Sequence, residues 1–420
     1  MTRLLDILHN RLGDFWWYSL MIFCACRVAD VLNMFVGLYL VPKYVDAKEL
    51  GAVIPLSSFA TTLALPAYIF AMTFMKELNT LATRRDFGRM KSLMQGVFLV
   101  TAILLIVAIV VSRLLMPVFL EKIRIVEGSL GFLILASAFV GCVAPIYTNA
   151  LQALKRFRAI SLMHIVGAPL RLVAMLVAMP FRPLSAYFVG QGATPAFQIA
   201  ASVWLLRKEL RVKAERYWSM PVFRRFALLF LGMAGYQLAS MLNGLVEMTV
   251  MREGLPDVQS AAYYMMTRFS DITSFVTGTL IVVLFPMTAE LAEQGKDTRP
   301  LVLKASLAQI VFGLVLGLFF FVFGRQIVSL LPHGSEYAEF FWLIPWMIGI
   351  NTLSSLQCFY VNTEASAGRF KFLWYWIPLH LAFMAYLTFF PVKSLWELTM
   401  YFLVTNVIRL IFAGVGIWRR

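Results

Sequence analysis

The stretch Arg207–Arg225, RKELRVKAERYWSMPVFRR, lies near the midpoint of the 420 residues and carries seven Arg and Lys against two Glu. A hydrophobic segment of similar length lies on either side of it. Basic residues interleaved with aromatic ones are typical of surfaces that bind nucleic acid. Between two hydrophobic halves, however, the same pattern indicates a basic loop at the cytoplasmic face of a membrane. We therefore expect no nucleic acid among the partners.

The composition is that of a membrane protein. Apolar residues make up 60% of the chain and charged residues 14%, and the mean hydropathy is +0.78. Soluble domains usually contain about half apolar and about a quarter charged residues. Apolar runs of about 20 residues, each long enough to cross the hydrocarbon core as a helix, recur along the whole chain. The sequence therefore predicts an all-α, polytopic integral membrane protein.

Twelve transmembrane helices are expected. The N-terminal residues lack a small-residue cleavage site, so we interpret the first apolar run as an uncleaved span and not as a signal peptide. The N-terminus, the even-numbered loops and the C-terminus hold 24 Lys and Arg, and the odd-numbered loops with adjoining span ends hold 9. Both termini are therefore predicted to be cytoplasmic. The predicted spans are 15–41, 52–75, 92–116, 130–151, 160–180, 185–206, 226–250, 259–286, 305–324, 338–362, 372–391 and 395–418.

The basic stretch divides the spans into two sets of six. We predict an N-lobe over 1–206, a cytoplasmic linker over 207–225 and a C-lobe over 226–420. Short matches recur between the halves at offsets of 210 to 213 residues. An even number of spans per half gives parallel lobes related by an axis along the membrane normal. The matches pair Ala29–Asn33 with Ala239–Asn243, Glu77–Leu78 with Glu290–Leu291, and Asn149–Arg158 with Asn362–Lys371.

Four arginines fall inside predicted spans: Arg27, Arg171, Arg268 and Arg409. Charged side chains at this depth usually face a bundle interior or a water-filled cavity. Arg27 and Arg268 each have an Asp three residues later, on the same helix face, so mutual neutralisation is one explanation for these two pairs. Arg171 and Arg409 have no carboxylate three or four residues away, so local pairing does not explain them.

Our hypothesis is that the four arginines line a central cavity and bind an anionic group such as a phosphate, which suits the fixed charge and forked donors of Arg. No ATP-binding loop, catalytic motif or metal-ligand cluster is found in the sequence, so no enzyme activity and no cofactor are expected. The four cysteines, Cys24, Cys26, Cys142 and Cys358, are interpreted as small buried hydrophobes. Other titratable groups in the spans are candidates for ion coupling or for pairing with the arginines: Asp30, Glu247, Asp271, His164 and His380.

Three segments resemble one family of transporters. Residues 37–51, GLYLVPKYVDAKELG, resemble the end of helix 1 and the following turn in Wzx-type oligosaccharide flippases. The exits of the fourth and tenth spans, LQALKRFRAI at 151–160 and EASAGRFKF at 364–372, resemble a loop pattern of the same family. The length and hydropathy profile extend the resemblance over the whole chain. The chain thus resembles Wzx-type members of the multidrug/oligosaccharidyl-lipid/polysaccharide (MOP) flippase superfamily.

The resemblance implies two six-helix lobes around a central cavity that opens alternately to each side. It implies a polyprenyl-pyrophosphate-linked oligosaccharide as substrate, flipped from the cytoplasmic to the outer leaflet for surface polysaccharide or O-antigen assembly. The arginines would meet the pyrophosphate or acidic sugars. The expected location is the cytoplasmic (inner) membrane of a bacterium or archaeon, with the bilayer and polysaccharide polymerase or assembly proteins as partners. A proton or sodium gradient, the membrane potential or downhill movement would drive transport.

Other classes stay open. A MATE-type cation or drug antiporter shares the architecture, but its cavity is expected to favour acids over arginines. A major-facilitator carrier should have a G-x-x-x-D-R/K-x-G-R-R/K loop after its second span, and residues 86–91, DFGRMK, lack the early Gly and the spacing. A lipid-II flippase usually carries two further C-terminal helices. A membrane scaffold does not need unpaired arginines at depth, and no large loop carries the carboxylate pair of a glycosyltransferase.

Overall fold

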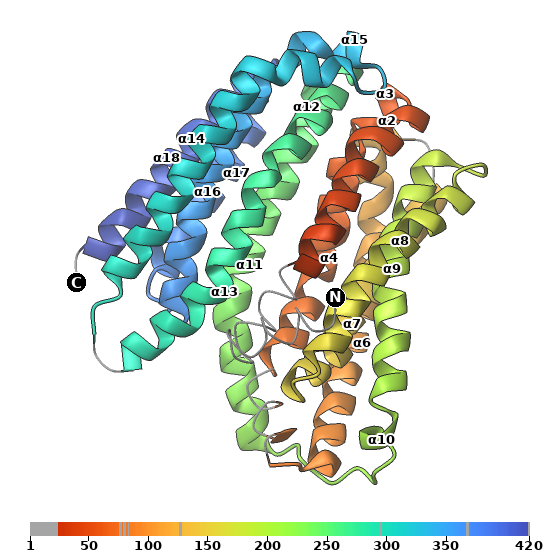
Figure 1. The fold of residues 1–420 in the computed structure, drawn as a ribbon, viewed down its shortest axis with the longest axis vertical. Coiled ribbons are helices and arrows are strands. Elements are labelled where there is room, and N and C mark those ends of the chain that lie inside the picture. Colours follow the sequence, from red (N-terminus) through yellow and green to blue (C-terminus); the bar gives the residue numbers. More distant parts are fainter. Residues whose placement is uncertain are drawn as a thin grey trace, which may run out of the picture. The chain divides into compact units, whose positions relative to one another are not determined.

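The computed structural model describes residues 24–74, 78, 81–82, 84–125, 128–293, 296–366 and 369–418. The regular elements found in these ranges are all helices, which confirms the predicted all-α class (Figure 1). Residues 15–23 of the first predicted span and Glu77 of the second repeat match lie outside the described residues.

Each of the predicted spans coincides with an observed helix, or with a pair of helices in one case. Six helices of the described part are long and apolar enough to cross a membrane. The long helices are Cys24–Tyr44, α4 (Val53–Thr73), α6 (Phe87–Lys122), α7 (Gly128–Ala153), α8 (Phe157–Ala178), α9 (Pro183–Leu205), α11 (Met220–Gly254), α12 (Asp257–Ser270) with α13 (Ile272–Glu293), α14 (Arg299–Ser329), α16 (Leu343–Ser366), α17 (Leu373–Phe389) and α18 (Leu395–Trp418).

Helix boundaries differ from the predicted ones in two informative places. The span predicted over 259–286 breaks at Asp271, where the hydroxyls of Ser270 and Thr273 bond carbonyls three residues earlier and compete with the helical ladder. The span predicted over 338–362 does not begin at 338. The short helix α15 (Gly334–Tyr337) ends before that residue, and Ala338–Phe340 form a 3-10 turn. The membrane helix α16 then begins at Leu343, which places Pro345 in its first turn, where a missing N–H is tolerated.

The first helix is not α-helical throughout. Residues Val36–Leu40 form a π-helical stretch between the α-helical part that starts at Cys24 and the short α2 (Val41–Tyr44). A π-helical turn has one more residue per hydrogen-bonded ring than an α-helix, and such turns often mark functional positions. After the π-helical stretch comes α2, and a turn at Val45 then leads into α3 (Ala47–Leu50).

The chain forms two compact units. The first comprises Met1–Val36, Phe59–Glu121 and Val126–Leu238, and the second comprises Gly37–Ser58, Lys122–Ile125 and Ala239–Arg420. The units interleave along the chain, because two short pieces of the first half are grouped with the second half. The predicted lobes divide the chain only once, at the linker, and they stay a prediction.

The core of unit 1 forms where α4, α6 and α7 meet the start of α11. Fully or nearly fully buried apolar side chains from these helices pack together there, among them Leu93, Ile146 and Phe226. The linker that follows α10 (Arg207–Leu210) is fastened to α6: the Glu215 N–H donates to the Gly88 carbonyl (3.1 Å), and Lys91 Nζ donates to the Val212 carbonyl (3.0 Å).

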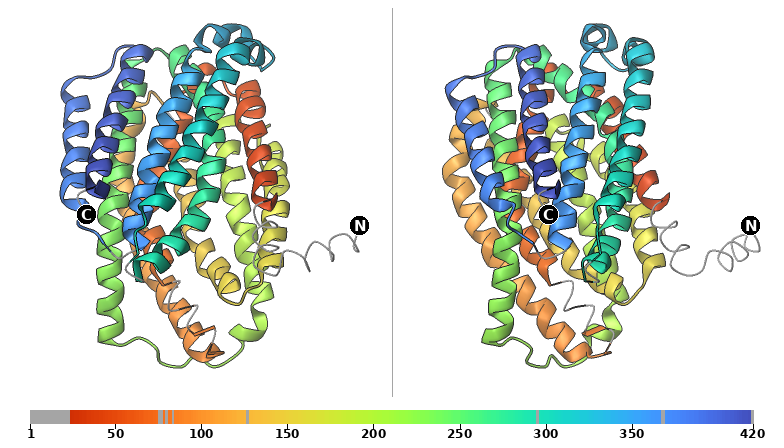
Figure 2. Two further views of the ribbon diagram at one scale, coloured as in Figure 1. Left: turned by 60° about the vertical axis from the view of Figure 1, so that its left-hand side comes forward. Right: turned by 90° about the vertical axis from the view of Figure 1, so that its left-hand side faces the viewer.

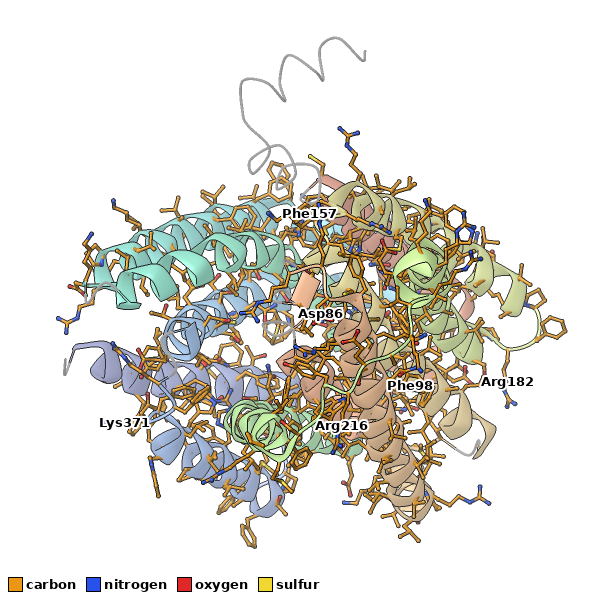
Figure 3. All side chains as sticks on the ribbon, turned by 90° about the horizontal axis from the view of Figure 1, so that it is seen from below. Asp86, Phe98, Phe157, Arg182, Arg216 and Lys371 are labelled. Atoms are coloured by element: carbon orange, nitrogen blue, oxygen red, sulfur yellow. The ribbon has the colours of Figure 1, made fainter. Side chains whose placement is uncertain are left out.

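Trp218 of the linker is also held by contacts with α6 and α11. Trp218 Nε1 donates to the Ser92 carbonyl (3.1 Å), and the indole packs against Phe226, with ring centroids 5.6 Å apart. The linker runs as an extended segment from α10 to α11 (Figures 2 and 3) and is held along α6 by these contacts.

Unit 2 is organised around α16, which packs against α12, α13, α14 and α18. Figure 2 shows α14 and α16 side by side over most of their length. The two helices approach closely at Gly313 of α14, where a side chain would collide with Thr352 of α16. Small residues at such crossings are typical of helix packing in membranes, where no hydrophobic driving force presses helices together.

Candidate functional site

Arg171, on α8, is held by a neutral partner in unit 1. Its Nη1 donates to Asn33 Oδ1 (2.7 Å), and its guanidinium lies 5.7 Å from the ring centroid of Tyr187 on α9. Gly190 of α9 permits this approach of α8 and α9, because a Cβ there would lie 3.1 Å from the Arg171 carbonyl oxygen. No ion pair of Arg171 is found among the described residues.

Arg27 and Asp30 form the other charged group of unit 1. Their side chains are joined over 3.1 Å between Nη2 and Oδ2, and both are roughly a quarter exposed, at 27% and 30%. His164 of α8 lies within electrostatic reach of Asp30. Together with Arg171, this group holds two guanidinium charges and one carboxylate, so its net charge is positive when His164 is neutral.

In unit 2, Arg409 of α18 has a carboxylate partner on another helix. Its Nη2 lies 3.6 Å from Glu247 Oε1 of α11, and the two side chains are only 11% and 8% exposed. Asn243 Nδ2, one turn earlier on α11, donates to the same carboxylate over 2.6 Å. The guanidinium also lies 5.0 Å from the ring centroid of Phe383. Spacing along one helix could not reveal this pair, because its members come from α11 and α18.

Arg268 and Asp271 form the second ion pair of unit 2, as their spacing predicted. Arg268 Nη1 donates to Asp271 Oδ2 over 3.1 Å, and the guanidinium lies 4.8 Å from the ring centroid of Tyr264. The stem of Arg268 passes the π-helical stretch at Gly37, where a Cβ would lie 3.4 Å from Arg268 Cδ. A glycine at this position therefore leaves room for the arginine.

A cavity of about 350 Å³ is lined by both of these ion pairs, Arg409–Glu247 and Arg268–Asp271. Its charges are balanced, with two guanidinium groups and two carboxylates. Between them lie hydroxyl and amide groups, and Asn351 Nδ2 donates to Ser270 Oγ over 2.8 Å. The lining residues are Ile54, Glu247, Met248, Tyr263, Thr267, Arg268, Ser270, Asp271, Met347, Ile350, Asn351, Ser354, Phe402, Asn406 and Arg409.

The two histidines proposed for ion coupling lie in different settings. His380, on α17, is buried, and its Nδ1 lies 2.8 Å from the Trp376 carbonyl oxygen one turn earlier. It is not among the residues that line the cavity. His164 lies in unit 1, near Asp30. Of the two, His164 lies near a carboxylate, whereas His380 has one nitrogen satisfied by a backbone carbonyl of its own helix.

Sequence reasoning missed the amide partners of the buried charges. Asn33 and Asn243 bond Arg171 and Glu247, respectively. Both asparagines end the first repeat match, Ala29–Asn33 with Ala239–Asn243, so the repeat itself contained the signal. No group of three or more side chains suited to a metal ion is found in the described ranges.

Comparisons with known proteins place the fold. No family model and no curated protein matches the chain. An inward-facing multidrug resistance MATE family transporter of the MOP superfamily superposes over 93% of this chain and 98% of its own, with a TM-score of 0.65 at 13% identity. The chain has the MOP fold. The lipid II flippase MurJ, in an inward closed conformation, covers 95% of this chain and 87% of its own (TM-score 0.67, 11% identity).

A third structure supports the same assignment. The Vibrio cholerae MATE transporter VcmN, in its bent form, covers 99% of this chain and 97% of its own, with a TM-score of 0.62 at 16% identity. These likenesses and the long apolar helices confirm a multi-pass membrane protein with the MOP fold. They extend to MATE transporters and a flippase alike, so the Wzx-type subgroup stays a prediction.

Proposed function

We propose that this protein is a flippase that moves a polyprenyl-pyrophosphate-linked oligosaccharide across the cytoplasmic membrane by alternating access. The observation that supports this most directly is the setting of Arg171. Arg171 is half-buried, and removing part of a guanidinium from water is costly unless an anion compensates it; Asn33 offers only a neutral oxygen. Arg171 Nε is buried and has no hydrogen-bond partner within the described part of the chain. A pyrophosphate would supply both the charge and the acceptor.

The cavity in unit 2, taken by itself, has groups that suit a neutral sugar. Its volume of about 350 Å³ falls in the usual range of ligand pockets, roughly 300–1,000 Å³. Its charges balance, so it offers hydrogen bonds without a strong preference for an ion. Asn351, Ser354 and Asn406 add amide and hydroxyl groups, and Tyr263 and Phe402 add aromatic surface beside them. Neutral hydroxyls of a glycan match these groups.

Glu247 is the best-placed coupling group of the proposed transporter. It lies on the cavity wall and shares its carboxylate between Arg409 and Asn243. Protonation of Glu247 would release Arg409 to meet another anion, which would link a proton gradient to substrate binding. We expect both termini in the cytoplasm and no ATPase domain in the chain. The product would pass to the polymerase and assembly proteins of a surface polysaccharide or O-antigen.

A MATE-type antiporter of cations or drugs is the second candidate. One observation favours it: Glu247 and Asp271 both line the cavity, and carboxylates on a cavity wall suit a cationic substrate. The MATE transporters among the similar structures support it as well as MurJ supports the flippase. The two candidates differ in the charge of the substrate, which an experiment can measure.

The test is leaflet exchange in proteoliposomes that contain a fluorescent polyprenyl-pyrophosphate-linked sugar, with and without proton or sodium gradients. We expect Arg171→Gln to slow exchange about 10- to 100-fold, because a charge-assisted hydrogen bond contributes about 1.5–3 kcal/mol. Arg158→Gln is the matched control, since Arg158 is exposed on the same helix, and its exchange rate should be normal.

Unchanged exchange in Arg171→Gln would contradict the assignment of Arg171. If the wild-type protein exchanges no lipid-linked sugar but exports an organic cation against a proton or sodium gradient, the antiporter is the correct function.

A further inference from the structure

A second polar centre of unit 2 lies at Arg252, in the last turn of α11. Its side chain is completely buried, at 0% exposure. Its Nη1 donates to Asp257 Oδ1 (2.7 Å), its Nη2 to the Lys48 carbonyl (2.7 Å) and its Nε to the Ile123 carbonyl (3.3 Å). Burial lowers the pKa of Arg252 from its ordinary value, and the neighbouring Asp257 carboxylate opposes that change. One guanidinium thus joins three separate segments of the chain.

Arg124 contacts the same carboxylate, that of Asp257. Its Nη1 lies 3.2 Å from Asp257 Oδ1, and its Nη2 donates to the Glu253 carbonyl (2.9 Å). Lys122 adds an exposed ion pair with Glu253, over 3.6 Å. Arg124 has a φ of 62°, in the left-handed region that non-glycine residues rarely adopt.

Close packing supports these polar contacts. The helix α3 lies against the start of α12 (Figure 1), and a Cβ at residue 51 would lie 2.6 Å from Ser260 Cβ. Asp46 caps α3, because its Oδ1 accepts from the Glu49 N–H over 2.8 Å. The turn at 45–51 is therefore held in one shape, which presents the Lys48 carbonyl to Arg252.

The segments that meet at this junction come from both halves of the chain. Residues 37–58 and 122–125 are the two pieces of the first half of the chain that belong to unit 2. Arg252 and Arg124 join them to the start of α12. All the segments involved are odd-numbered loops or their edges in the predicted topology, so the junction lies at the predicted outer face of the membrane.

The chemistry of the junction permits it to come apart. Its polar contacts are ion pairs and hydrogen bonds to carbonyls, and water can replace these. The desolvation cost of a buried ion pair offsets much of its attraction, so such a pair adds little net stability while both partners are present. The core of unit 1, by contrast, is apolar, and water cannot substitute for its contacts.

We propose that the Arg252 junction is a lock that closes the outer end of the transport path and opens once in each transport cycle. The proposal rests on the proposed function only in that the protein transports by alternating access; it does not depend on the identity of the substrate. When the lock opens, residues 37–58 and 122–125 separate from α12, and water reaches the cavity of unit 2 from the outside.

The first test weakens the lock and measures how accessible the cavity is. Asp257→Asn removes the carboxylate that both arginines share. A single cysteine at the cavity residue Ser354 (Ser354→Cys), in a chain without Cys24, Cys26, Cys142 and Cys358, reports opening by its reaction with a membrane-impermeant maleimide added outside. We expect Asp257→Asn to speed this labelling several-fold.

Asp297→Asn is the matched control, because the Asp297–Arg299 pair (3.7 Å) is local and joins no distant segments. It should leave the labelling rate unchanged. Equal labelling rates in the Asp257→Asn variant and in the Ser354→Cys protein with native Asp257 would overturn the proposal. The readout needs no substrate, so it can succeed even if the lipid-linked sugar proves to be the wrong substrate.

The second test holds the lock closed while Arg252 and Asp257 stay native. Lys122→Cys and Glu253→Cys together place two thiols at an exposed ion pair of the junction. A short thiol-cleavable cross-linker between them should stop transport, and a reductant should restore it. Full transport by the cross-linked protein would overturn the proposal, and this arm remains informative even if Asp257→Asn does not fold.

Discussion

Each of the two units contains an arginine on a long helix, half-buried for Arg171 and 11% exposed for Arg409, and the two arginines have different partners. In unit 1, Arg171 is bonded to the neutral amide of Asn33. In unit 2, Arg409 faces the carboxylate of Glu247. The first arrangement leaves a positive charge available to an anionic ligand, whereas the second is already balanced. The difference teaches that intramembrane arginines need not share one role, and that the partner of each decides whether it can bind an anion.

The asparagines sharpen this comparison. Asn33 and Asn243 hold matching positions in the predicted repeat, yet Asn33 accepts a hydrogen bond from a guanidinium and Asn243 donates one to a carboxylate. An amide can do both, because it carries an acceptor oxygen and a donor nitrogen. If the repeat reflects a duplication, the same residue type was kept while the charge beside it changed sign.

The largest expected effect concerns the balanced pair. Arg409→Gln leaves Glu247 buried without its cation, and breaking a buried pair costs about 3–5 kcal/mol. We expect a loss of that size in the free energy of unfolding, measured by denaturant titration in mixed micelles. The double variant Arg409→Gln with Glu247→Gln should recover most of the loss. Additive losses in the double variant would show that the two residues are not coupled.

The second prediction makes the arginine of unit 1 resemble that of unit 2. Asn33→Asp gives Arg171 a carboxylate partner of the kind that Arg409 has. The new charge would compete with the substrate anion, so leaflet exchange should fall about tenfold, since one charge-assisted hydrogen bond contributes about 1.5–3 kcal/mol. Asn33→Ala is the control: it removes the amide but adds no charge, and it should slow exchange far less. Equal rates for both variants would refute the distinction between the units.

The smallest effect is expected for the local pair of unit 1. Asp30 and Arg27 are three residues apart on one helix and partly exposed. Such pairs contribute about 0.2–0.5 kcal/mol, so Asp30→Asn should change the free energy of unfolding by no more than this. The same denaturant titration measures it. A loss above about 2 kcal/mol would mean that Asp30 has a structural role that its neighbours do not explain.

Much of the fold could be predicted from the sequence, because hydropathy and helix length both follow from one physical requirement. A chain that crosses hydrocarbon must satisfy its backbone internally, so apolar runs of sufficient length become helices. The break at Asp271 and the π-helical stretch Val36–Leu40 could not be predicted in this way. Both depend on local hydrogen bonds and on the packing of neighbouring helices, which hydropathy averages away.

The site was predictable only where its partners lie close together in the chain. The spacing of three residues found the Arg268–Asp271 pair, and the structure contains it. The Arg409–Glu247 pair joins two helices from distant parts of the chain, so no spacing rule could find it. No sequence pattern marks Arg252, because its acceptors are largely backbone carbonyls, which every residue has.

The Arg252 junction also has a consequence for how the protein is made. Arg252 lies 204 residues after Lys48, whose carbonyl accepts one of its hydrogen bonds. At a synthesis rate of about 5–20 residues per second, about 10–40 s pass between the two. During that interval the turn at 45–51 emerges without the arginine that fixes it. The helices that are made first must therefore stay in the bilayer without this hydrogen bond until α11, which carries Arg252, has been made.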